Sequence, residues 1–96
     1  KTNIKKISNA LDKVNNMRGV FFDWKDQEKY GNRKQLGFIA QEVESVVPEL
    51  VMELENDIKS VNYSQTVALL LEAIKDQNEI INKLKDDVEY LKTKIN

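Results

Sequence analysis

Serine hydroxyls, lysine amines and carboxylates are the side chains left to do chemistry in this chain of 96 residues, because it has no histidine and no cysteine. Histidine is the usual general base and cysteine the usual thiolate ligand, so most common catalytic and metal sites are excluded. The candidate nucleophiles by residue type are Ser8, Ser45, Ser60 and Ser64. No catalytic motif surrounds any of them, and helix capping explains Ser8 and Ser64 better.

Two groups of basic residues raise the possibility of binding to phosphate or nucleic acid. They are Lys1, Lys5 and Lys6 at the start, and Lys25, Lys29, Arg33 and Lys34 near the aromatic residues 21–24. However, aromatic side chains of a small domain normally pack its core, and the chain balances 15 basic against 16 acidic residues. We therefore expect no nucleic-acid partner, and no cofactor or metal ion.

The sequence contains neither a signal peptide nor an apolar run near the ~20 residues that span a bilayer, so we expect no membrane partner. It begins without Met, which predicts a fragment of a longer polypeptide. Its length suffices for one small domain, and we divide it into a head (residues 1–63) and a C-terminal helix (residues 64–96). About 60 residues are near the lower limit for a self-sufficient core, so assembly should supply part of the burial.

The C-terminal helix carries apolar residues in alternating steps of three and four, the pattern of heptad positions a and d in a coiled coil. We call these nine positions the seam: Val67, Leu70, Ile74, Gln77, Ile81, Leu84, Val88, Leu91 and Ile95. The a residues are all β-branched, and every d residue except Gln77 is leucine. A monomer would leave much of this stripe in water, so the seam predicts association between chains.

The number of chains is open from the heptads alone. β-branched residues at a with leucine at d favour two strands, whereas Leu71 and Ile80 widen the apolar face as higher-order bundles require. Asp87 and Lys92 have the g-to-e spacing that suits parallel chains in register, and Gln77 is a buried amide that could fix that register. The alternative is an amphipathic helix that folds back on its own domain.

The head reads as short helices and two β-hairpins. Ser8 is the expected N-cap of a first helix that ends at Gly19. Residues 20–25 and 36–40 are expected strands around a polar turn or flexible loop. A short helix near Val43 should stop at Pro48, and Gly37 should permit a close backbone approach.

A second hairpin is expected from residues 50–54 and 58–61, around an Asn-Asp turn. Asn62 and Ser64 are both possible N-caps of the terminal helix. Tyr63 should pack where that helix leaves the head. Gln41 and Glu42, near a helix start, are expected to cap and solubilise and not to catalyse.

Three blocks of residues resemble the endosialidase-type C-terminal intramolecular chaperone domain, which closes many bacteriophage tail spikes, tail fibres and neck appendages. The blocks are RGVFFDWK at 18–25, GFIAQEV at 37–43 with PELV at 48–51, and KSVNYS at 59–64 leading into LLLEAIK at 69–75. The resemblance covers nearly the whole chain in the right order. It implies an α+β head followed by a long helix that forms a parallel trimeric coiled coil.

The resemblance also implies self-cleavage after the preceding fibrous domain has folded in register. In this family the cut falls before a serine in a motif like Ser-Asp-x-x-Leu-Lys, and the lysine five residues later is the base. A lysine that folding removes from water loses its proton more readily, so this pair needs no histidine. Lys1 matches that lysine, which makes it the candidate general base. The serine would lie upstream of this chain, so the chain as written should cleave nothing.

Three functions follow as alternatives. The first is a homotrimeric folding chaperone of a phage fibre, acting on the fibrous domain of its own precursor in the host cytoplasm and released from the mature virion. The second is a coiled-coil oligomerisation module without a release step. The third is the same self-cleaving domain in a membrane-tethered transcription factor.

Overall fold

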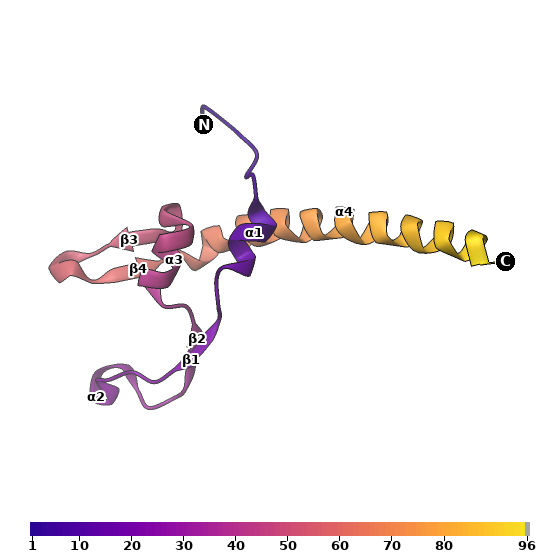
Figure 1. Ribbon diagram of the computed structural model, residues 1–96. Coiled ribbons are helices and arrows are strands. Elements are labelled where there is room, and N and C mark those ends of the chain that lie inside the picture. The colour runs from indigo at the N-terminus through magenta and orange to yellow at the C-terminus, as the bar shows by residue number, and fades with distance from the viewer. Residues whose placement is uncertain (96) are drawn as a thin grey trace.

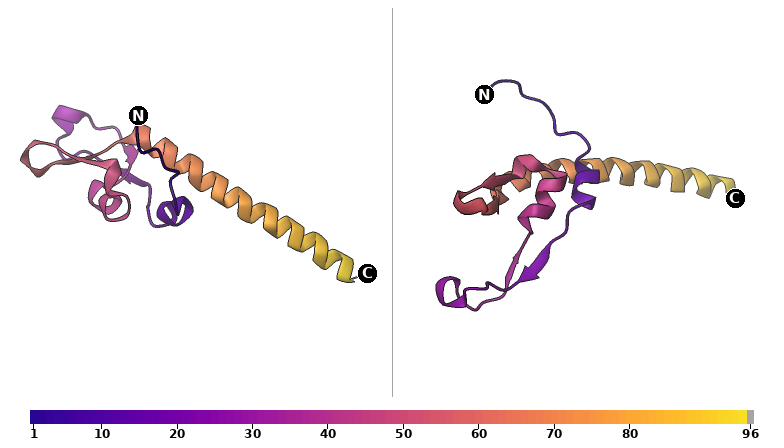
Figure 2. Two further views of the ribbon diagram at one scale, coloured as in Figure 1. Left: turned by 90° about the horizontal axis from the view of Figure 1, so that it is seen from above. Right: turned by 60° about the vertical axis from the view of Figure 1, so that its left-hand side comes forward.

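The computed structural model describes residues 1–95, and it is an elongated molecule of 67 × 38 × 19 Å. A small α+β head lies at one end of a long C-terminal helix, as the sequence predicted (Figure 1). The N-terminal segment and the first hairpin project from opposite sides of that helix (Figures 1 and 2). The division at residues 63 and 64 stays a prediction.

The long helix α4 spans Tyr63–Ile95. It contains no glycine or proline, which leaves its backbone hydrogen bonding uninterrupted. Asn62 is its N-cap, because the Oδ1 of Asn62 accepts a hydrogen bond from the amide of Gln65 at 3.1 Å. The hydroxyl of Ser64, the other predicted cap, donates to the same Oδ1 at 2.8 Å. Asn96, the last residue of the predicted helix, lies outside the described residues.

Both predicted hairpins are present, with strands of three residues each. Strands β1 (Val20–Phe22) and β2 (Gln35–Gly37) pair antiparallel, with Val20 opposite Gly37. Strands β3 (Val51–Glu53) and β4 (Lys59–Val61) form a second antiparallel pair. Their turn contains the 3₁₀ helix η2 (Glu55–Asp57), and the left-handed backbone of Asn56 and Asp57 suits these residue types.

The loop of the first hairpin corrects one prediction. It contains a short helix, α2 (Gln27–Tyr30), where the sequence predicted only a turn or flexible loop. The side chain of Asp26 caps this helix by accepting a hydrogen bond from the amide of Lys29 at 3.1 Å. This cap is a local signal in the sequence, because an aspartate at the N-cap accepts a hydrogen bond from the amide three residues later.

Helix α1 (Ala10–Asn15) corrects a second prediction, because neither Ser8 nor Gly19 bounds it. Its N-cap is Asn9, in a left-handed conformation and without a side-chain cap. The free amide of Leu11 instead donates to the Oδ2 of Asp76 on α4, at 3.4 Å. At the other end the side-chain amide of Asn16 donates to the carbonyl of Asp12 at 2.8 Å and closes the last turn.

Helix α3 (Ala40–Val46) and the 3₁₀ helix η1 (Pro48–Leu50) complete the head. Proline at the start of η1 cannot extend α3, as the sequence predicted. The core combines side chains from α1, α3, η1, β4 and α4, and most of them are small. Its buried apolar residues are Ala10, Val43, Val47, Leu50, Val61, Leu69 and Ala73. So small a core agrees with the expectation that the head has little burial of its own.

Candidate functional site

Helix α4 has two faces with different surroundings. Thr66, Leu69 and Ala73 are buried against the head. The nine seam residues lie on another face and are all exposed, and the eight apolar ones among them are between 42% and 83% exposed. The helix therefore carries its own head on one face and presents a continuous apolar stripe to solvent on the other. The fold-back alternative fails for the seam, because the head covers a different face.

Polar contacts also attach the head to α4. Lys6 lies 3.8 Å from the carboxylate of Glu72, and Lys75 lies 3.7 Å from it, so one largely buried carboxylate faces two ammonium groups. The buried hydroxyl of Thr66 donates to the carbonyl of Asn62 at 3.1 Å. The contact of Lys6 links the N-terminal segment to α4, and the hydrogen bond from Leu11 to Asp76 links α1 to it. The contacts of Lys75 and Thr66 lie within α4 and its cap.

Tyr63 joins the first residue of α4 to the β1–β2 hairpin. Its hydroxyl accepts a hydrogen bond from the amide of Phe38 at 3.2 Å, and the two rings stack with centroids 5.7 Å apart. Gly37 makes this approach possible, because a Cβ there would lie 2.6 Å from the Tyr63 hydroxyl and 3.1 Å from Phe22. Two predictions are thereby confirmed, the packing of Tyr63 and the close approach at Gly37.

Replacing Gly37 with alanine should lower the free energy of unfolding by about 1–3 kcal/mol, because the new methyl group overpacks this junction. Chemical denaturation measures the change. Gly19→Ala is the matched control, since a Cβ at Gly19 meets nothing within 4 Å. Removing the hydroxyl with Tyr63→Phe should reduce the cost of Gly37→Ala, and full additivity of the two changes would contradict this reading.

Arg18 and Glu42 form a bidentate ion pair that links the start of β1 to the first turn of α3. The Nε and Nη2 of Arg18 each donate to one carboxylate oxygen at 2.8 Å. The hydrogen bonds from Arg18 hold the pKa of Glu42 below its usual value. Any stability from this pair is therefore present above the unfolded pKa of Glu42 and is lost as the pH falls through the folded one. The sequence did not predict this pairing of Glu42 with Arg18, although the two residues lie in the blocks at 37–43 and 18–25.

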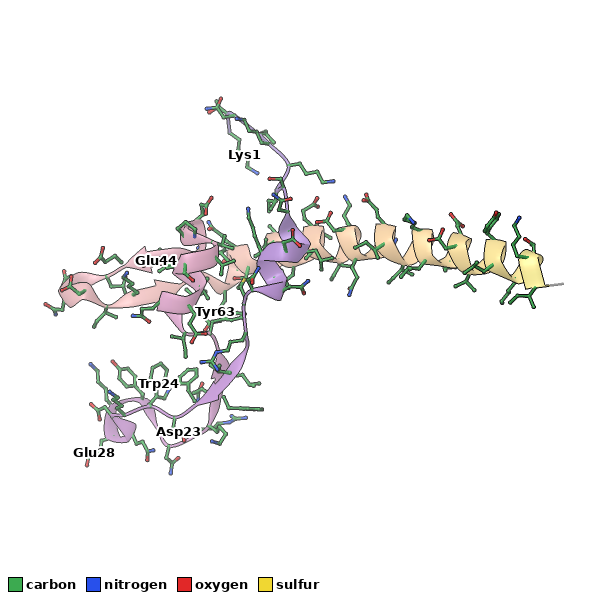
Figure 3. The ribbon with its side chains drawn as sticks, viewed as in Figure 1. Lys1, Asp23, Trp24, Glu28, Glu44 and Tyr63 are labelled. Carbon is green, nitrogen blue, oxygen red and sulfur yellow. The ribbon has the colours of Figure 1, made fainter. Side chains whose placement is uncertain are left out.

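Three aromatic residues of the first hairpin pack on one another and not in the core as predicted, whereas Phe21 is 70% exposed. The rings of Phe22 and Trp24 meet edge to face at 5.0 Å, and Tyr30 lies 4.9 Å from Trp24. Two of the nearby cations are engaged within the same loop. Lys34 lies 3.6 Å from Asp23, and Lys29 lies over the ring of Tyr30. This arrangement is that of a stabilised hairpin arm (Figure 3).

The sequence-predicted chemical residues do not converge on one site in the single chain. Lys1 is exposed at the tip of the N-terminal segment, far from the labelled residues of the hairpin arm (Figure 3). The hydroxyl of Ser45 donates to the carbonyl of Glu42 at 2.7 Å, and Ser64 belongs to the α4 cap. Ser8 is exposed and Ser60 is partly buried in β4.

Residues 1–95 contain neither a metal-binding cluster nor a membrane-spanning helix. Within that range no group of histidine, cysteine, aspartate or glutamate side chains has an arrangement that could hold a metal ion. Across the same residues no helix combines the length and the apolarity needed to cross a bilayer.

This geometry defines a class of protein, a small α+β head on a long helix with an exposed heptad seam. Comparison with known proteins identifies the family, because the model of the family described as chaperone of endosialidase matches residues 1–52, more than half of the chain. The chain belongs to the chaperone of endosialidase family, as its sequence blocks predicted.

Several curated relatives are long tail fibre proteins of bacteriophages. The long tail fiber protein Gp37 of Enterobacteria phage K3 and that of phage T2 are each 37% identical over 92 residues, which cover 88% of this chain. The corresponding protein of Salmonella phage S16 is 32% identical over 100 residues, covering 96% of this chain and 13% of that protein. This chain spans only 7% of the K3 and T2 fibre proteins.

Proposed function

We propose that this chain is the C-terminal intramolecular chaperone of a phage tail fibre. Three copies associate through their seams into a parallel coiled coil and hold three fibrous segments in register while these segments fold. The observation that carries this proposal is the seam of nine exposed positions along a helix whose first turns bury a different face, at Thr66, Leu69 and Ala73, against the head.

The energy available from the seam supports association. Burying one Val, Leu or Ile side chain contributes ~1.5–3 kcal/mol, so eight such side chains per chain provide on the order of 10 kcal/mol even if only partly buried. Residues 77–95 lie beyond the helix residues that pack in the head core, so that part of α4 gains its apolar contacts from other chains. An isolated helix with this stripe in water would be marginal.

A parallel arrangement suits the position of the heads. Each head lies at the N-terminal end of α4 (Figure 1). Parallel helices would therefore place all heads together, beside the segments that precede them in the fibre. Asp87 is bonded within its own helix by Lys83 at 3.0 Å, so the predicted contact between Asp87 and Lys92 of another chain would share this carboxylate. The number three comes from the family resemblance.

The relatives support a phage setting over the cellular alternative. They are named as tail fibre proteins, so we place this chain in the host cytoplasm during virion assembly, with its own preceding fibrous domain as its partner. The coiled-coil module without release remains the second candidate, because the exposed seam alone is sufficient for it.

The release step is proposed for the longer precursor. The hydroxyl of a serine upstream of Lys1 would attack the carbonyl carbon of the peptide bond before that serine, and Lys1 would accept the hydroxyl proton. That C–N bond would break, the freed amine of the serine would take up the proton, and water would hydrolyse the resulting ester to separate the two parts. Lys1 is exposed in the single chain, so neighbouring chains or the preceding segment would have to remove it from water. That requirement would couple cleavage to correct assembly.

A longer polypeptide that adds the preceding residues tests this function. We expect one cut a few residues before Lys1 in trimeric material, detected by mass spectrometry. Lys1→Ala should reduce the rate of cutting by at least about 100-fold, the usual contribution of a general base. It should leave the trimer intact, and Lys5→Ala should cut normally. A trimeric precursor that stays uncut would refute the release step and favour the simple module.

A further inference from the structure

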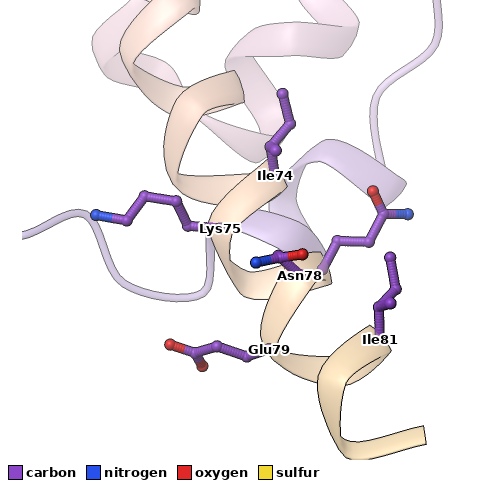
Figure 4. Close-up of a pocket in the computed structure, with 6 residues that line it drawn as sticks. Ile74, Lys75, Asn78, Glu79 and Ile81 are labelled. Carbon is purple, nitrogen blue, oxygen red and sulfur yellow. The ribbon is translucent and has the colours of Figure 1, made fainter. Parts of the chain in front are cut away.

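Gln77 is the one polar residue of the seam, and its surroundings in α4 are apolar or uncharged. It lies between the isoleucine layers of Ile74 and Ile81, and the other d positions are leucine. In Figure 4, Ile74 and Ile81 project from one side of the helix, whereas Lys75 and Glu79 project from the opposite side. Gln77 is exposed in the single chain, so its amide is free to enter an interface.

We propose that the three Gln77 side chains of the assembled trimer bind one monovalent anion, of the size of chloride or bromide, on the three-fold axis. This site rests on the proposed trimer, because the d positions of three parallel chains meet at that axis. No single chain can form it. The ligand is recognised by amide N–H groups alone.

The directions of the donors and acceptors favour an anion. Three amides bring six N–H donors and three carbonyl oxygens with two lone pairs each. In a ring in which each amide donates to the next carbonyl and turns its second N–H toward the axis, the second lone pair of each carbonyl points outward, so the three axial N–H groups have no acceptor between the isoleucine layers. Buried donors without partners are costly. An ion on the axis accepts all three, whereas a water molecule has two lone pairs and brings two donors of its own.

The charges around this layer do not oppose an anion. The e and g positions beside Gln77 are Ala73, Asn78 and Ile80, all uncharged. The nearest carboxylates lie on the outer face. Asp76 faces helix α1, where it accepts the hydrogen bond of Leu11, and Glu79 projects away from Ile74 and Ile81 (Figure 4). Because the ion must lose its water, weakly hydrated chloride and bromide should bind better than fluoride.

Thermal unfolding at fixed protein concentration and ionic strength tests the site in solution, with sodium chloride replacing sodium fluoride in steps. The midpoint should rise by about 2–4 °C for each tenfold increase in chloride above its dissociation constant. Gln77→Leu, confirmed as a trimer by its mass, should lose this dependence. Gln65→Leu, which changes an exposed glutamine outside the seam, should keep it.

Crystals of the wild-type chain grown with sodium bromide give a second readout that needs no variant. We expect an anomalous bromide peak on the three-fold axis, within hydrogen-bond distance of three Gln77 amides. A trimer with a water molecule or a closed amide ring there would overturn the anion site and leave the proposed function intact. A bromide peak without chloride dependence in solution would also overturn it, as binding at crystal concentration only. A monomer or dimer would instead overturn the trimer itself.

Discussion

Replacing Ile81 with aspartate should convert the associated chain into a monomer at micromolar concentration. Ile81 is an a residue near the middle of the seam, 47% exposed in the single chain, and a trimer would bring three copies into one layer. The substitution would remove three buried isoleucine side chains from this layer. It would also place three carboxylates close to one another and away from water. We expect a cost of at least ~3 kcal/mol per chain, or on the order of 9 kcal/mol per trimer. Light scattering coupled to size exclusion measures the mass.

Asn82→Asp is the matched control, because it adds the same charge one residue further along, at a b position outside the seam. It should leave the mass unchanged. In a longer polypeptide that includes the preceding fibrous domain, Ile81→Asp should also abolish the trimeric fibre that the control still forms. Equal behaviour of the two variants would contradict the assignment of the seam as the interface.

Leu69→Ala should loosen the head while the chains stay associated. Leu69 is 2% exposed and joins α4 to the head core, so removing its side chain should lower the stability of the head by about 2–5 kcal/mol. For so small a core this change approaches the whole stability of the head. Amide hydrogen exchange should speed up in α1, α3 and β4 but stay slow in the second half of α4.

Leu70→Ala is the matched comparison for Leu69→Ala. Leu70 is the next residue along the chain and belongs to the seam. This substitution should weaken association and leave exchange in the head nearly unchanged at concentrations where the trimer persists. If both variants weakened the head and the association equally, the two faces of α4 would not be independent. The separation of the helix into a head-binding face and a seam would then be wrong.

The elements that the sequence predicted are those with a strong local signal. Helix α4 follows from four heptads without a helix breaker, and the hairpins follow from short β-branched and aromatic runs between turn residues. The sequence predicts close packing at Gly37 and Tyr63, and the structure confirms both. At both positions the residue type alone indicates the packing, because glycine has no Cβ and tyrosine has a large ring with a hydroxyl.

The features that the sequence did not predict depend on contacts between distant residues. Ser8 looked like the cap of α1, but the amide of Leu11 uses Asp76, which lies 65 residues away. The sequence predicts a capping or solubilising role for Glu42, whereas in the structure its carboxylate pairs with Arg18. No local pattern predicts which face of α4 the head covers, because the buried residues Thr66 and Ala73 are small.

The candidate site shows the same division. The helix that carries the seam could be predicted, because the heptad pattern lies within one helix. The role of the seam as an interface stays a prediction. A pairing of Lys1 with a nucleophile could not be predicted, because it depends on residues and chains that surround the N-terminal segment. Gln77 lies between these cases: its position is local, and its role depends on three chains meeting.

Sedimentation equilibrium of the chain is the most direct test of the proposed trimer. A trimer predicts a single species of three times the 11.1 kDa chain mass at micromolar concentration, and a steady mass on dilution until the trimer dissociates cooperatively. A stable species of one chain mass would contradict association through the seam. A mass of two chains would keep the coiled coil and contradict the trimeric chaperone.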